Sequence, residues 1–156
     1  MASGGKSDGM LVDSDFSNGS TWSEGVNEFE NVRAHGTLVV GQVVTIVPTV
    51  TGPLTAAPVA LTGYQKVGVV LAAATIGQQV VVQTRGYAEA LVDGNTNDVT
   101  ADDFLEVIAA GTAFTLDHAT VRSVNSVGMA VDAQAGATAV LSSVYLIGER
   151  VIVAGS

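Results

Sequence analysis

The sequence predicts an all-β protein, a small barrel or sandwich built from two similar half-repeats with an extended N-terminal arm. The chain of 156 residues holds 27 valines against 10 leucines, together with 18 glycines. An excess of β-branched residues and glycine is typical of sheets joined by many turns. From about residue 36 onward, short apolar runs alternate with Gly, Asn, Asp and Pro, and one pattern of runs occurs twice.

Length and composition predict one domain with a core of its own. A compact chain of this length buries roughly 70% of the surface that its unfolded form exposes, so it needs no disulfide or metal to fold. Hydrophobic residues make up 47% of the chain and charged residues 13%, which excludes disorder over most of its length. Glu, Lys, Arg and Leu are too few for a coiled coil.

The first 30 residues predict a flexible acidic arm, followed by a barrel-like domain at residues 31–156. Residues 1–30 hold six of the fifteen acidic residues and many Gly and Ser, and such a segment buries too little apolar surface to order itself. Its isolated apolar residues are the candidate partner-binding residues: Leu11, Phe16, Trp22 and Phe29. A plain disordered terminus is the alternative, but the lone tryptophan favours an arm that orders against a partner.

Alternating short apolar runs predict nine strands in the rest of the chain. They are Thr37–Val40, Gln42–Val47, Gly68–Leu71, Gln79–Arg85, Tyr87–Leu91, Phe104–Ile108, Ser126–Val131, Ala139–Leu146 and Arg150–Val153. Pro48, Pro53 and Pro58 confine Val50–Ala60 to a loop or an edge strand, because proline lacks the N–H that a central strand needs.

A repeat predicts that the domain consists of two similar halves, with an offset of about 60 residues. Each copy has a leading segment, a strand with a turn of small residues, and a return strand. The first copy comprises Val40–Ile46, Val67–Gly77 and Gln78–Thr84, and the second comprises Ala101–Val107, Val127–Gly136 and Ala137–Ser143. The last two segments of each copy form a hairpin, and the two halves are expected to close on each other. Chance similarity among Val-, Ala- and Gly-rich strings is the alternative.

Charge and cysteine content exclude several classes of partner. The net charge is −9 and the six basic residues are scattered singly, which argues against nucleic-acid binding. The isoelectric point near 4.3 argues equally against an anionic membrane surface. Cysteine is absent, which rules out a disulfide or a thiolate metal site. Without a signal peptide or a long apolar segment, a soluble protein made in the cytoplasm is expected.

Neither an enzyme nor a bound cofactor is expected. His35 and His118 stand alone, the second in an expected loop, and no G-x-S-x-G motif is present. Tyr64, Tyr87 and Tyr145 are spread out, whereas a sugar-binding site usually needs aromatic platforms on one face. A shared packing role is the interpretation for Tyr87 and Tyr145.

One acidic segment is similar to a calcium-binding loop. Asp93–Asn97 offers oxygen ligands at alternate positions, but Asp98 and Phe104 stand where such a loop needs glycine and glutamate. A turn is therefore expected, with a weak surface calcium site between Asp93 and Asp103 as the open alternative.

Four segments carry a resemblance to a known family. They are Val40–Val44, Lys66–Ala74, Gln79–Tyr87 and Ser126–Gly136. Their succession is a G-Q-x-V strand, a V-G-V strand, an Ala/Gly turn and a V-x-V strand that ends in glycine. Across residues 36–147 this order resembles the small capsid cement, or decoration, proteins of tailed phages. The acidic N-terminal arm departs from that family.

The resemblance implies a small β-barrel-like fold without catalysis, seated as a homotrimer on the outside of a phage capsid. The expected function is therefore that of a virion protein that binds the major capsid protein and stabilises the shell. Another phage structural role, as a head fibre, tail or baseplate component, is one alternative. A carbohydrate-binding β-domain is a second alternative, from a different class of function.

Overall fold

The computed structural model describes residues 20–49, 52–58, 63–95, 97–110, 113–119, 126–136, 139–147 and 150–152. Within these ranges all regular secondary structure is β-strand, which confirms the predicted all-β class. No helix in them could cross a membrane. The strands are β1 (Thr21–Glu24), β2 (Asn27–Ala34), β3 (Val43–Thr49), β4 (Gly52–Pro58), β5 (Gly63–Val70), β6 (Gln79–Val92), β7 (Phe104–Ala110), β8 (Ala113–Ala119), β9 (Ser126–Ala130), β10 (Val140–Ile147) and β11 (Arg150–Ile152).

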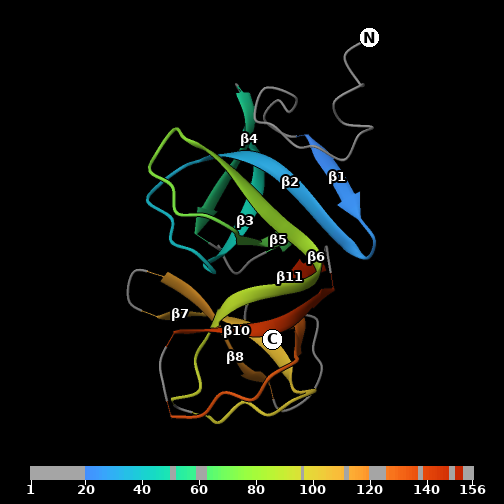
Figure 1. The fold of residues 1–156 in the computed structure, drawn as a ribbon. Coiled ribbons are helices and arrows are strands. Elements are labelled where there is room, and N and C mark those ends of the chain that lie inside the picture. The colour runs from blue at the N-terminus through green and yellow to red at the C-terminus, as the bar shows by residue number, and fades with distance from the viewer. Residues whose placement is uncertain are drawn as a thin grey trace.

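The strands form two closed five-stranded barrels that share β6, and Figure 1 shows one barrel above the other. The first ring runs β2–β4–β3–β5–β6 and closes where β2 pairs with β6. The second runs β6–β10–β9–β7–β8 and closes through the parallel pair of Val92 and Leu116. Outside the rings, β1 pairs with β2 and β11 pairs with β5.

The strand registers confirm the repeat that the sequence predicts. The pairs Val32–Val80 and Leu38–Ala74 of the first barrel correspond to Val92–Val140 and Val99–Gln134 of the second, and the offset of each residue is 60 or 61 positions. Each half closes its own barrel, instead of the two halves closing on each other. The physical reason is the length of β6, whose 14 residues complete both rings.

A bend in the middle of β6 turns it from the first barrel into the second. The sequence predicted two strands here, and the structure joins them through Gly86, whose φ is 94°. A β-carbon at Gly86 would overlap Asn27, the first residue of β2, so only glycine fits. The buried side chain of Gln83 spans the bend, because its Nε2 donates to the carbonyl oxygens of Arg85 (3.1 Å) and Tyr87 (2.7 Å).

Several other strand predictions differ from the structure. Thr37–Val40 is not a strand: it holds the bridge of Leu38 to Ala74 and then enters a turn. Val50–Ala60 contains β4, which pairs with β3 on one side and β2 on the other and is therefore no edge. β8 was not expected, and it places His118 opposite Leu105 instead of in a loop. Pairing that the local pattern does not report decides these cases: Leu38 bridges to Ala74, β4 pairs in parallel with β2, and β8 pairs with its neighbour β7.

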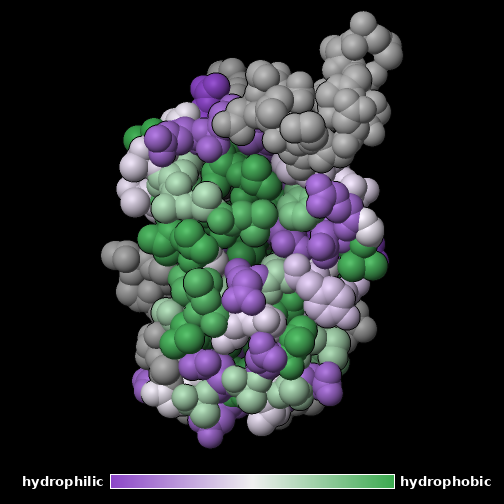
Figure 2. Space-filling view, in the orientation of Figure 1, coloured by the Kyte–Doolittle hydropathy of each residue, from purple (hydrophilic) through white to green (hydrophobic). Residues whose placement is uncertain are grey.

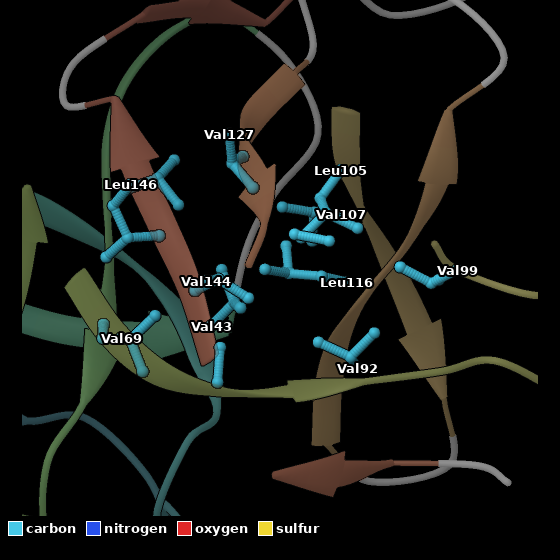
Figure 3. Close-up of a cluster of buried hydrophobic side chains, with 14 residues drawn as sticks. Val43, Val69, Val92, Val99, Leu105, Val107, Leu116, Val127, Val144 and Leu146 are labelled. Atoms are coloured by element: carbon cyan, nitrogen blue, oxygen red, sulfur yellow. The ribbon is translucent and has the colours of Figure 1, made fainter. Parts of the chain in front are cut away.

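Two clusters of buried apolar side chains form the core. Val44, Ile46 and Val82 belong to the cluster of the first barrel. The second cluster lies in the second barrel, but Val43 and Val69 join it from β3 and β5 of the first, as Figure 3 shows. Successive residues of a strand point to opposite faces of the sheet. On β3, Val44 therefore points into the first barrel, and Val43 points out of it and packs against the second barrel. Sharing a core in this way holds the two barrels together.

The turn at Gly41 seats the first barrel on the second. Gly41 has a φ of 81°, and its carbonyl oxygen accepts a hydrogen bond of 2.9 Å from the backbone N–H of Leu91 in β6. A β-carbon at this position would overlap the side chain of Leu141 in β10 and lie 3.1 Å from the Leu91 nitrogen. The contact therefore needs glycine for two reasons, its backbone conformation and the close approach.

The expected boundary between arm and domain, after residue 30, falls inside β2. Residues 21–34 form a hairpin of β1 and β2, and β2 then pairs with β6. The last third of the expected arm is thus part of the first barrel, because Glu30 and Val32 on β2 face its interior. Residues 1–19 lie outside the described residues.

Gly41→Ala should destabilise the protein more than Gly77→Ala. Both glycines have positive φ, which costs an L-residue roughly 1–2 kcal/mol, but only Gly41 adds an overlap, worth roughly 1–3 kcal/mol more. Urea denaturation of both variants measures the difference. Equal losses of unfolding free energy in the two variants would show that the turn at Gly41 does not pack closely against the second barrel.

A chain that starts at residue 20 should fold, whereas one that starts at residue 31 should not. The first cut leaves every pair of the β1–β2 hairpin in place, but the second removes β1 and half of β2 together with the pairs Phe29–Gln83 and Glu30–Val82. A loss of several kcal/mol is comparable to the whole stability of a small domain. Circular dichroism with a melting curve checks both truncations, and equal stability of the two would contradict the register of β2.

Candidate functional site

Of the predicted partner-binding residues, Leu11 and Phe16 lie outside the described residues. Trp22 and Phe29 face each other across the β1–β2 hairpin, with stacked rings whose centroids are 5.6 Å apart. Both side chains are half-buried. Their role in binding a partner stays a prediction, but the structure gives them a contact inside the chain that the sequence did not suggest.

The main candidate site is a groove between the two barrels, with a volume of about 600 Å³. We call it the apolar groove. Its lining comes from the loop before β3, the end of β5, the bend of β6, the end of β9, and β10. The residues are Val40, Val70, Leu71, Gln83, Tyr87, Ala88, Glu89, Val131, Leu141 and Ser143.

Large apolar side chains concentrate around this groove. Val40, Leu71, Tyr87, Val131 and Leu141 line it and are between 39% and 61% exposed. Figure 2 shows the matching green band of apolar surface, which extends over both barrels and is interrupted by small polar areas. Contiguous apolar patches of this kind are uncommon on the surface of a monomeric protein, which makes the groove the main candidate site.

The structure explains why these side chains stay outside the core. Leu71 and Val131 hold equivalent places, 60 residues apart, just after β5 and β9. Each follows the last inward residue of its strand, Val70 or Ala130, and therefore points away from the barrel. Because the turn at Gly41 seats the first barrel on the second, these outward residues meet along one seam.

A row of large side chains crosses the outer face of the second barrel beside the groove. Phe104, Met129, Tyr145 and Tyr87 are opposed in register on β7, β9, β10 and β6. The rings of Tyr87 and Tyr145 meet edge to face with centroids 4.9 Å apart, the packing role expected for them. The sequence did not reveal this row, because it needs the registers of four strands.

The groove offers one carboxylate and little else that is ionisable. Glu89 lies on β6, and its Oε1 accepts a hydrogen bond of 3.0 Å from the hydroxyl of Ser143. Elsewhere, His35 is exposed in the loop after β2, while the side chain of His118 lies outside the described residues. The prediction that the chain is not an enzyme stays a prediction.

The acidic segment similar to a calcium loop adopts turns, as expected. Asp93 is buried, and its Oδ1 accepts a hydrogen bond of 2.8 Å from the N–H of Asn95. The Oδ2 of Asp103 accepts one of 2.7 Å from the N–H of Thr100. Among the described residues, no three of His, Asp and Glu gather where they could hold a metal ion.

Comparison with known proteins identifies a structure with the same fold. No family model and no curated protein match the chain. Among solved structures, the chain is similar to the N base of the head fibre protein gp8.5 of bacteriophage phi29, with a TM-score of 0.55 and 14% sequence identity. The match covers 77% of this chain and 93% of that one. At this identity the similarity shows a shared fold.

Proposed function

We propose that this chain is a structural protein of a bacteriophage virion that binds the outside of the head. The observation that carries the proposal is the double barrel, because the similar phi29 structure is the base of a head fibre and is covered over 93% of its length. The sequence resemblance to capsid decoration proteins points to the same location. The protein is made in the host cytoplasm and joins the shell there.

The apolar groove is the surface that docks on the major capsid protein. It has the composition of the centre of a protein interface, with aliphatic and tyrosine side chains around one carboxylate that already has a hydrogen-bond partner. Burying one exposed leucine or valine contributes roughly 1.5–3 kcal/mol. Several such side chains in one patch suffice for a specific contact.

The mechanism is mechanical and depends on bridging. DNA packed inside a head presses outward on capsomers whose seams are separate weak contacts. A homotrimer that holds several capsomers adds contacts that must break together, which raises the effective affinity far above that of one contact. The shell then resists pressure and heat better with the protein than without it.

A fibre base is the second candidate, favoured by the phi29 neighbour itself. Such a base uses the same docking surface but carries a projecting part and need not strengthen the shell. The two roles differ in a measurable property, the temperature at which empty heads come apart. Added protein raises this temperature if it is a cement, and leaves it unchanged if it is an anchor.

Leu141→Asp and Val131→Asp should each weaken binding to heads about tenfold, which corresponds to about 1.4 kcal/mol. A carboxylate in the centre of an apolar contact must lose its hydration without gaining a partner. Co-sedimentation of the variants with heads that lack this protein measures the affinity. The matched control is Ile76→Asp, since Ile76 is 71% exposed and does not line the groove.

If Ile76→Asp weakens binding as much as the groove variants do, docking does not depend on the groove. If neither the wild-type chain nor any variant sediments with heads, the proposed function is wrong. A cryo-EM map of the whole virion provides the second measurement. Density for the double barrel on the tail would place the protein elsewhere on the virion.

We also expect a homotrimer, free in solution or formed on the shell. The low share of charged residues, 13%, and the sequence resemblance to decoration proteins support this expectation. Light scattering coupled to size exclusion, at several concentrations, measures the mass in solution, and symmetry in the cryo-EM map measures it on the head. A chain that is monomeric in both settings contradicts this expectation.

A further inference from the structure

A second cavity lies at the hairpin end of the first barrel, with a volume of about 390 Å³. It shares no lining residue with the apolar groove. Its volume falls within the range of small-molecule sites, which are roughly 300–1,000 Å³. We call it the hairpin cavity, and its residues are Thr21, Trp22, Ser23, Glu28, Phe29, Lys66 and Thr84.

An ion pair with a buried carboxylate lies at this cavity. Glu30 of β2 is 1% exposed and its Oε2 is 2.6 Å from the Nζ of Lys66 on β5, a residue that lines the cavity. Glu30 stands in register with Val82 and shares the inward side of β2 with Val32. The carboxylate of Glu30 is thus buried beside a lysine whose side chain is 27% exposed, and burying a charge is unfavourable unless its partner offsets the loss of hydration.

The second barrel shows that the fold does not need this pair. The 60-residue offset matches Glu30 with Ala90 and Lys66 with Ser126, both of which are completely buried. The same ring of strands therefore closes around an alanine and a serine. A buried site favours uncharged residues, and the second barrel has them at the equivalent place. The charge pair in the first barrel therefore points to a function there.

An aromatic wall distinguishes the same end of the first barrel. Trp22 and Phe29 stack with 20° between their planes and both line the cavity. Trp22 is the single tryptophan of the chain and stands on β1. The positions 60 residues further on belong to β6, so the second barrel has no counterpart of this strand. The wall and the ion pair thus occur together and only in the first barrel.

The charges around the cavity oppose each other. Lys66 faces Glu30, and the Oε1 of Glu28 is 3.8 Å from Nη1 of Arg85. A balanced arrangement does not select an anion or a cation. The cavity offers the ammonium of Lys66 as a donor, the carboxylate of Glu28 as an acceptor, and the hydroxyls of Thr21 and Ser23. It also offers an apolar aromatic surface. A ligand that fits has one apolar face, many hydroxyl groups and no net charge.

We propose that the hairpin cavity binds a neutral hexopyranose unit of a glycan. The apolar C–H face of the sugar ring packs on the indole ring of Trp22, and the hydroxyl groups at the edge of the sugar ring stay free to form hydrogen bonds. The ring hydroxyls accept from the ammonium of Lys66 and donate to the carboxylate of Glu28. This inference is independent of the function proposed for the apolar groove.

The test uses the full chain with glucose, galactose, mannose and N-acetylglucosamine as free probes. Saturation-transfer NMR and calorimetry measure binding, and at least one probe should bind with a dissociation constant of about 1 mM, a typical value for a small weak ligand. Trp22→Ala should weaken that binding at least about tenfold. The matched control is Tyr87→Ala, which removes an exposed aromatic residue outside this cavity and should leave sugar binding unchanged.

A double variant separates binding from folding. Glu30→Leu with Lys66→Met removes both charges at similar side-chain volume, so the protein should melt at or above the wild-type temperature while sugar binding falls at least about fivefold. This variant decides the question if Trp22→Ala disturbs the hairpin. The proposal is wrong if no probe binds, or if the double variant binds as the wild type does. It is also wrong if Trp22→Ala weakens binding to heads and leaves sugar binding intact, since the aromatic wall is then a protein contact.

Discussion

The whole architecture depends on one strand that belongs to two barrels. Residues 79–85 of β6 pair with β2, and residues 85–92 pair with β10. The bend between them requires Gly86, because Asn27 at the start of β2 leaves no room for a β-carbon. The side chain of Gln83 holds the bend by donating to backbone carbonyls on both sides of it. Closing both rings on one strand leaves β6 with no free edge, which protects it from pairing with other chains.

Duplication explains which features of the barrel are required and which are additions. Gly68 and Gly128 occupy equivalent places, and at both of them a β-carbon would overlap the neighbouring strand. The loops before β3 and β7 repeat the same hydrogen bond, from Val39 to the Gln42 side chain and from Thr100 to the Asp103 side chain. Features in one copy alone, such as β1 and the Glu30–Lys66 pair, are not needed for closure. They are the places where function is best sought.

The two candidate sites differ in chemistry because they lie at different places in the duplicated fold. The apolar groove lies along the seam, where outward residues of both copies meet, and it suits a large protein partner. The hairpin cavity lies beside the β1–β2 hairpin, where Thr84 of β6 lines it, and combines an aromatic wall with paired charges. The proposed contacts with a phage head and with a glycan would therefore use separate surfaces.

The sequence by itself determined the all-β class, the repeat, and most strands after residue 42, because alternation and turn residues are local signals. It also pointed to Trp22 and Phe29, although as parts of an arm. Tertiary structure decided that each repeat closes its own barrel, that β4 is a central strand, and that β2 begins before residue 30. It alone brought Leu71 beside Val131 and Lys66 beside Glu30. These contacts join strands far apart in the chain, and their register depends on long-range pairing that no local pattern encodes.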